Sequence, residues 1–180
     1  WLKKRSSART SLRKKNNEKR HGGAAAIWRR KIEMAGIVAK FGGSSLADAA
    51  QLEKVKKIIE ANPERRYVVP SAPGKRHSDD TKVTDLLYMF QKSVQYGHDS
   101  TEIFRKIFER YVGIRDALHL SIPIEEYLET VRENVMKGAS EDYTASRGEY
   151  LNGLLLADLL GYEFIDAAEV VFFDKRGKYD

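Results

Sequence analysis

The stretch Ile37-Val38-Ala39-Lys40-Phe41-Gly42-Gly43-Ser44-Ser45 joins a short apolar run to a lysine, two glycines and two hydroxyls. The apolar run is typical of a strand, and apolar side chains then recur at helical spacing over residues 45–61. A strand, a glycine turn and a helix N-terminus let backbone N–H groups face an anion. Glycine has no Cβ, so the backbone can approach a phosphate closely. The stretch therefore predicts a phosphate-handling site, to which Lys40 adds a positive charge.

The predicted helix over 45–61 leads into a second strand. Ser45 is expected to cap this helix, with Asp48 three residues later as in a capping box, and Asn62-Pro63 is expected to end it. Residues 66–72 have the continuous apolar centre of a buried parallel strand. The two strands and the helix between them predict a βαβ unit with a right-handed crossover.

The rest of the chain is mostly helical in pattern. Thr81 or Thr84 is expected to cap a helix that ends near residue 96, and further helices are expected at 101–118, 123–137 and 142–160. Residues 164–166 and 170–173 have the apolar character of strands. Strands that alternate with helices indicate the α/β class.

Length and composition narrow the class of protein. The chain has 180 residues, 42% hydrophobic and 32% charged, which is typical of a globular domain with a sizeable core. No apolar run is long enough to span a membrane. The absence of cysteine excludes disulfides, thiolate metal sites and cysteine nucleophiles. It is compatible with a reducing compartment, and we expect a cytoplasmic protein without a membrane partner.

The net charge of +6 comes from one end of the chain. Residues 1–33 hold 12 Lys or Arg and 2 Asp or Glu, whereas residues 34–180 hold 20 and 24. Such dense like charge predicts disorder. A nucleic-acid arm, a membrane-surface segment and a transit peptide are three possible functions for it. We expect instead that residues 1–33 form a basic extension that is disordered or non-native, and that the protein has no nucleic-acid partner.

Several side chains have both a chemical and a structural interpretation. Lys40 either contacts a phosphate or is simply solvated, and we expect the contact. Glu149 lies on a leucine-rich helix, either on a solvated face or directed into a cleft to hold a cationic group. Thr84 either caps a helix or lies near a ligand at the end of the sheet where the loops leave the strands. The loop with His77, Asp79 and Asp80 is expected to be solvated rather than a metal site. The two common nucleotide fingerprints, G-x-x-x-x-G-K-[ST] and G-x-G-x-x-G, are absent.

Four segments taken together resemble the aspartokinases in order and separation, over residues 34–180. These segments are Lys40-Phe41-Gly42-Gly43-Ser44-Ser45, Val68-Val69-Pro70-Ser71-Ala72, Lys82-Val83-Thr84-Asp85-Leu86-Leu87 and Ser146-Arg147-Gly148-Glu149-Tyr150-Leu151. The resemblance implies the amino-acid kinase fold, a three-layer αβα sandwich around a mostly parallel sheet, here truncated.

The resemblance also implies a reaction and a site. The γ-phosphoryl of ATP, bound with Mg²⁺ through its phosphates, would be transferred to the β-carboxylate of L-aspartate, the first step towards lysine, threonine and methionine. Lys40 would be catalytic. By position, the phosphate-binding residues would be Lys40, Phe41, Gly42, Gly43 and Ser44, and the aspartate-binding residues would be Ser71, Ala72, Thr84 and Glu149. Glu149 would pair with the α-ammonium of aspartate, and no protein metal site is expected.

The sequence also departs from this family. The loop at 73–80 is less glycine-rich than the family's, and the nucleotide-side segment Arg-Gly-Gly-Ser-Asp and the ACT domains are missing. We therefore expect residues 34–180 to be the N-terminal, substrate-side part of the kinase domain, and the full-length protein to be a homo-oligomer. A related kinase for glutamate, N-acetylglutamate or a nucleotide remains an alternative. A non-catalytic fragment or binding module is another.

Overall fold

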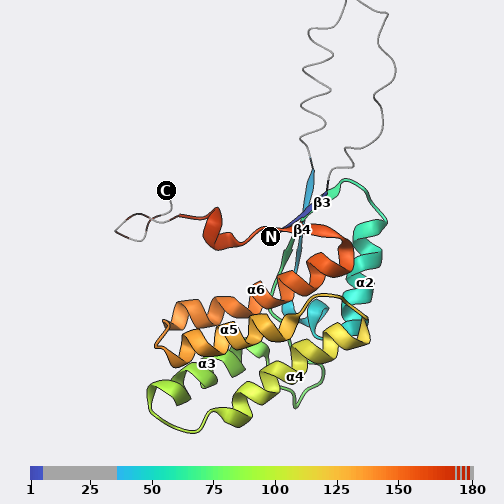
Figure 1. Ribbon diagram of the computed structural model, residues 1–180. Helices are drawn as coiled ribbons and strands as arrows, with labels where there is room; N and C mark the ends of the chain where they lie inside the picture. The colour runs from blue at the N-terminus through green and yellow to red at the C-terminus, as the bar shows by residue number, and fades with distance from the viewer. Residues whose placement is uncertain (6–35, 173, 175, 177, 179–180) are drawn as a thin grey trace, which may run out of the picture.

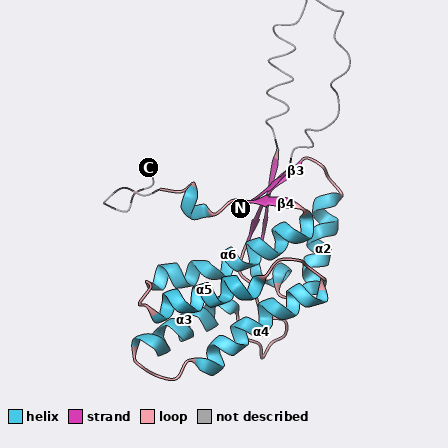
Figure 2. Cartoon of the chain, in the orientation of Figure 1, coloured by secondary structure: helices cyan, strands magenta, loops and turns pink. Residues whose placement is uncertain are grey.

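The computed structural model describes residues 1–5, 36–172, 174, 176 and 178. Figures 1 and 2 show a small sheet with a group of helices beside it and beyond the ends of its strands. The elements, in chain order, are β1 (Leu2–Lys4), β2 (Ile37–Phe41), η1 (Gly43–Leu46), α2 (Ala49–Glu60), β3 (Arg65–Pro70), α3 (Val83–Gln95), α4 (Thr101–Ala117), α5 (Ile124–Met136), α6 (Glu141–Leu160), β4 (Tyr162–Phe164) and η2 (Ala167–Glu169). The expected α/β class is confirmed.

The sheet is mixed, with strand order β2-β3-β1-β4. β2 and β3 pair in parallel, and β1 pairs antiparallel with both β3 and β4. Strands β2, β3 and β4 therefore share one direction, and β1 runs against them, so that β2–β3 is the parallel pair among the described strands. The register places Lys40 opposite Val69 and Phe41 opposite Pro70. The loops that leave β2 and β3 consequently start side by side at the C-terminal ends of these strands.

β1 differs from the expectation for the basic segment. Leu2 pairs with Val68 and with Phe164, and its side chain is fully buried. Disorder over residues 1–33 is therefore wrong for Leu2–Lys4, because an apolar residue among cations can still fill a gap between two strands. Residues 6–33 lie outside the described residues, so the rest of that prediction and the boundary at 33/34 stay predictions.

Two local expectations at the first helix and at the chain end are corrected. Ser45 lies in the 3-10 turn η1, where its N–H donates to Gly42 O at 3.0 Å, and the cap of α2 is Asp48, whose carboxylate accepts from Gln51 N at 2.9 Å. Val170, Val171 and Phe172 form no strand, because an apolar run needs a neighbouring strand to pair with. Phe173, the last residue of that expected strand, lies outside the described residues.

The remaining helices follow the sequence pattern closely. Ser140 caps α6 by accepting from Tyr143 N at 3.1 Å, and Gly161 ends this helix with a φ of 64°, in the left-handed region that favours glycine. α3 begins with Lys82 at the cap position and without a side-chain cap bond, so neither Thr81 nor Thr84 caps it. Thr84 lies instead inside the first turn of α3.

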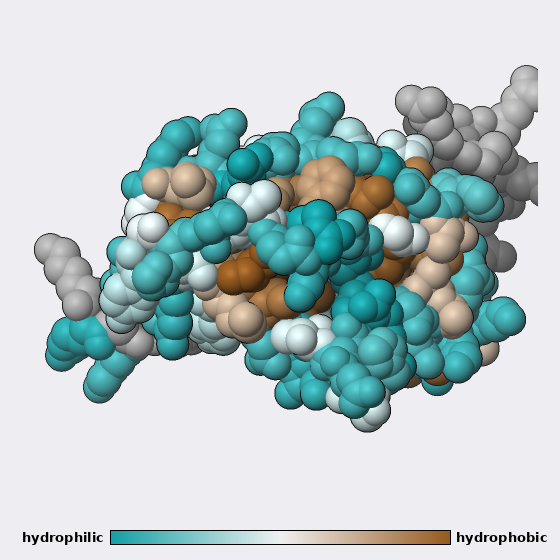
Figure 3. All heavy atoms as spheres, turned by 90° about the horizontal axis from the view of Figure 1, so that it is seen from below, coloured by the Kyte–Doolittle hydropathy of each residue, from teal (hydrophilic) through white to brown (hydrophobic). Residues whose placement is uncertain are grey.

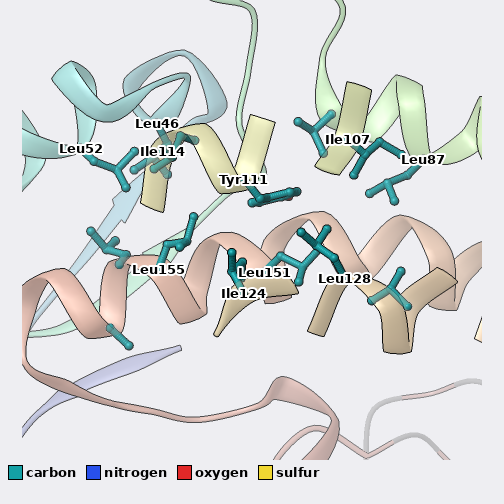
Figure 4. Packing of buried hydrophobic residues seen from close by; sticks show 14 of the residues in the cluster. Leu46, Leu52, Leu87, Ile107, Tyr111, Ile114, Ile124, Leu128, Leu151 and Leu155 are labelled. Carbon is teal, nitrogen blue, oxygen red and sulfur yellow. The ribbon is translucent and has the colours of Figure 1, made fainter. Parts of the chain in front are cut away.

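The core lies between the helices and continues under the sheet. Figure 4 shows Tyr111 and Ile114 of α4 facing Leu151 and Leu155 of α6, and all four side chains are almost fully buried. α6 also contacts β3 and β4, so its leucine-rich run is covered on several sides. A helix that is apolar nearly all round is expected in such a central position. Because α6 is packed on several sides, its position is well defined, and so are the positions of the residues along it.

The surface combines charged and apolar side chains. Seen from below Figure 1, brown apolar side chains lie on both sides of a central group of teal hydrophilic ones (Figure 3). Elsewhere, the described residues form a hollow of about 440 Å³, whose lining includes Phe90, Phe104 and Phe108. Within the part of the chain that the structure describes, no helix has the length and apolar character needed to cross a membrane.

Candidate functional site

The site begins where the loops after β2 and β3 touch. Gly74 N donates to Gly43 O at 2.8 Å. A Cβ on Gly43 would lie 2.9 Å from Ala72 O, and a Cβ on Gly74 would lie 2.6 Å from the carbonyl carbon of Gly43. Both distances are too short for real atoms, so this contact requires glycine at both positions. A Cβ on Gly42 would meet nothing within 4 Å, and glycine there leaves the backbone accessible.

Helix α6 forms the next wall of the site. A Cβ on Gly148 would lie 2.7 Å from the Cβ of Ala72 and 3.3 Å from Cδ1 of Leu87, so the helix can approach the loop only with glycine at 148. The next residue, Glu149, accepts a hydrogen bond from Ala72 N at its Oε1, at 3.3 Å. The close approach of α6 therefore brings a carboxylate to the end of β3.

Two further hydrogen bonds fix α6 in this position. Tyr111 of α4 donates its hydroxyl to Gly148 O at 2.8 Å, and the complete burial of this side chain raises the pKa of the phenol well above its ordinary value. Asn152 Nδ2 donates to Ser71 O at 2.7 Å. The Oδ1 of Asn152 is buried and has no partner among the described residues. These bonds tie α6 to α4 and to the end of β3.

These elements enclose a cavity of about 430 Å³, lined by Gly43, Ser44, Ser71, Ala72, Pro73, Gly74, Lys75, Lys82, Thr84 and Glu149. Six of the residues predicted from the sequence are therefore brought together, namely Gly43, Ser44, Ser71, Ala72, Thr84 and Glu149. The hydroxyls of Ser44, Ser71 and Thr84 make no hydrogen bond within the described part of the chain. They are free to bind a ligand.

The other three predicted residues precede Gly43 in the chain and do not line this cavity. Lys40 is exposed on β2, and its ammonium has no partner among the described residues. Phe41 is half-buried and packs against the core, and its carbonyl accepts from Ser71 N at 3.1 Å. Gly42 accepts from Ser45 N. Phe41 and Gly42 thus shape the start of the loop through their backbones.

Arg110 of α4 is a structural residue that the sequence analysis missed. Its side chain is only 4% exposed, and its guanidinium donates to Gly74 O at 2.9 Å, to Ala47 O at 3.4 Å and to Asp80 Oδ2 at 2.6 Å. Burial lowers the pKa of Arg110 despite the neighbouring carboxylate. Nothing in the sequence marks this arginine, which lies inside an amphipathic helix, because its hydrogen-bond partners are distant in the chain.

The loop that holds Asp80 is only partly solvated. His77 and Asp79 are exposed, as expected. The Asp80 side chain is only 8% exposed and also accepts from Arg76 Nε at 2.8 Å. Hydrogen bonding to Arg76, together with the charge of Arg110, holds the pKa of Asp80 well below its usual range. The expectation of a solvated loop is therefore wrong for Asp80. Across the described ranges, no group of three His, Cys, Asp or Glu is arranged to hold a metal ion.

Comparison with known proteins gives a consistent set of relatives. No family model matches the sequence. Aspartokinase 3 of Bacillus subtilis is 37% identical over 142 residues, which cover 74% of this chain and 31% of that protein. The crystal structure of Clostridium acetobutylicum aspartate kinase is 52% identical, with a TM-score of 0.79 over 82% of this chain and 34% of that one.

A second similar structure contains ligands. It is that of Escherichia coli aspartokinase III in complex with aspartate and ADP, which is 25% identical with a TM-score of 0.64, over 81% of this chain and 35% of that one. The chain thus spans about one third of the length of each of these three relatives.

Proposed function

This chain is a homologue of the aspartokinases, and we propose that it forms the substrate-side part of an enzyme that phosphorylates the β-carboxylate of L-aspartate with ATP. A carboxylate oxygen of aspartate would attack the γ-phosphorus, the bond from that phosphorus to the bridging oxygen would break, and 4-phospho-L-aspartate and ADP would result. This would be the first step towards lysine, threonine and methionine, in a cytoplasmic and homo-oligomeric enzyme.

One observation carries the proposal: Glu149 and Thr84 share a single cavity with Gly43 and Ser44. A substrate with an ammonium and carboxylates needs both a carboxylate partner and donors of hydrogen bonds. Glu149 supplies the first, and the unpaired hydroxyls and glycine backbone supply the second. The aspartate and ADP bound to the E. coli relative support the same class of ligand.

Each residue then has a distinct proposed role. Glu149 pairs with the α-ammonium of aspartate, while the hydroxyls of Ser71 and Thr84 donate to a carboxylate. Lys40 and the backbone N–H groups of Gly42 and Gly43 neutralise charge on the transferring phosphoryl group. Phosphoryl transfer asks mainly for positioning and charge neutralisation, which these groups provide. Mg²⁺ would enter with ATP and neutralise phosphate charge while bound largely to phosphates and water.

The first experiment measures the reaction itself. ADP formation and trapping of the acyl phosphate by hydroxylamine are measured with aspartate, glutamate and N-acetylglutamate. The assay uses this chain and a polypeptide that extends it to the length of its relatives. We expect turnover with aspartate in the longer polypeptide. Turnover with another acceptor alone would favour the alternative kinases, and no turnover in either polypeptide would favour a non-catalytic binding module.

Two substitutions test the assigned roles in the longer polypeptide. Lys40→Ala is expected to lower kcat by about 100-fold or more, the effect of removing one group that stabilises developing charge. Glu149→Ala is expected chiefly to raise the KM for aspartate. Lys57→Ala, at an exposed position of α2, is the matched control for loss of a lysine. An unchanged kcat in Lys40→Ala would refute the role given to Lys40.

A further inference from the structure

The loop between β3 and α3 places two lysines at the cavity. Lys75 and Lys82 both line it, as does Glu149. Lys75 Nζ donates to Ser78 O at 3.2 Å, and the Lys82 ammonium has no partner among the described residues. Residues 71–82 contain no helix or strand. The loop therefore depends on other contacts to hold these two cations in place.

Those contacts converge on one buried ion pair. Arg110 donates to Asp80 at the far end of the loop, and to the carbonyl of Gly74 at its near end. Asp80 in turn accepts from the backbone N of Arg76 at 2.9 Å and from both the Nε and Nη2 of that residue. One arginine and one aspartate thus tie down the two ends of the segment that carries Lys75 and precedes Lys82.

The burial of this pair makes it a strong restraint. Both side chains are less than a tenth exposed. Removal of one partner of a buried ion pair leaves an uncompensated charge, which is strongly destabilising. The surface pair Lys137–Glu133 of α5 has side chains 70% and 65% exposed and contributes little to such a restraint. Loop order therefore depends on the Arg110–Asp80 pair far more than on the surface pairs.

We propose that Arg110 and Asp80 are positioning residues that hold residues 73–82 so that Lys75 and Lys82 face the cavity and bind an anionic group of a substrate. This rests on the function proposed above. The anionic group is a carboxylate of the acceptor or a phosphate of the nucleotide. Both present oxygen acceptors to an ammonium, so the assay measures each substrate separately.

The test is a double-mutant cycle in the polypeptide extended to the length of its relatives. KM for aspartate and KM for ATP are measured for Lys75→Ala/Lys82→Ala, for Asp80→Asn, and for the combination. Removal of the two lysines should raise one KM about tenfold, because a hydrogen bond to a charged group contributes roughly that much to binding. A rise in the KM for aspartate identifies a carboxylate as the bound group, and a rise in the KM for ATP identifies a phosphate.

In the Asp80→Asn background the lysine substitutions are expected to change KM less than about twofold, because the lysines no longer face the cavity. Arg110→Lys, which keeps the charge but loses the forked geometry, is expected to raise the same KM. Glu133→Gln, which breaks the surface pair on α5, is the control and is expected to leave KM unchanged. Fully additive effects of the lysines and Asp80→Asn would overturn the proposal.

A second measurement does not depend on enzymatic activity. Hydrogen exchange of the backbone amides in residues 74–82 is compared between this chain and its Asp80→Asn and Glu133→Gln variants. We expect protection to be lost in Asp80→Asn and kept in Glu133→Gln. Unchanged protection in Asp80→Asn would overturn the positioning role. Absence of turnover in the unmodified polypeptide, with the loop still protected, would instead refute only the proposed reaction.

Discussion

Replacement of Gly148 by alanine is a sharp test of how closely α6 must approach the substrate loop. The new Cβ would lie 2.7 Å from the Cβ of Ala72, whereas two carbon atoms in contact prefer about 3.5–4.0 Å. The helix and the loop must therefore separate by about 1 Å. Because Glu149 follows directly in the chain, this separation also moves its carboxylate relative to Ala72 N.

The effects on stability and on function are expected to differ. Alanine in place of glycine favours a helix by about 1 kcal/mol, while overpacking costs about 1–3 kcal/mol. The free energy of unfolding should therefore fall by no more than about 2 kcal/mol. A displacement of about 1 Å at a reacting centre can lower kcat/KM about 100-fold. We expect Gly148→Ala to remain folded and to lose most of its kcat/KM for aspartate.

Two other glycines provide controls in the same polypeptide. Gly113→Ala, on the exposed side of α4, meets nothing within 4 Å and should be stabilising by about 1 kcal/mol with unchanged kinetics. Gly153→Ala creates a contact of 2.8 Å with the ring of Phe164, so it reports the cost of a clash outside the cavity. The assays are urea unfolding and steady-state kinetics. If Gly148→Ala keeps kcat/KM within twofold of the unmodified protein, close packing at this position does not govern the site.

Three further predictions concern the supports of the site. Tyr111→Phe leaves the carbonyl of Gly148 without its donor, and urea unfolding should show a loss of about 1–2 kcal/mol. Asn152→Ala removes the donor to the carbonyl that follows β3 and opens a small cavity, so thermal unfolding should show a loss of about 2 kcal/mol; an unchanged Tm would contradict the role of this bond. Asp80 has a depressed pKa in the folded state, chiefly through Arg76, so its stabilising contribution is present above its unfolded pKa of about 3.9 and is lost as the pH falls below that value. When the pH is lowered from about 5.5 to about 3, urea unfolding should therefore show a smaller loss of stability in Asp80→Asn than in the unmodified protein.

Much of the fold could be predicted because its signals are local. The glycines that follow β2, the apolar spacing of α2 and the leucines of α6 all act through near neighbours in the chain. The expected strand at 170–173 was wrong over Val170–Phe172, because a strand is defined by its pairing partner rather than by its own composition. β1 was missed for the converse reason, since only the gap between β3 and β4 explains why Leu2 is buried.

The candidate site could likewise be predicted from the sequence only in part. Ser71, Thr84 and Glu149 were expected near one another, and the structure brings them to one cavity, although their roles and that of Lys40 stay predictions. The structural role of Arg110 could not be predicted from the sequence, because its guanidinium bonds to carbonyls and a carboxylate that are distant in the chain. Asn152 was detectable, since an amide among leucines on a buried helix needs a hydrogen-bond partner.

Arg110 and Tyr111 are consecutive residues of α4, and together they bond to three of the segments that form the cavity. Arg110 bonds to Ala47 beyond η1 and to Gly74 after β3, while Tyr111 bonds to Gly148 of α6. These three segments therefore share one support, a single turn of α4. The backbone of these segments is held before a ligand enters, which limits the conformational entropy that their backbone loses on binding. Affinity in this cavity is thus tied to the rigidity of a single turn of a helix that contributes no lining residue itself.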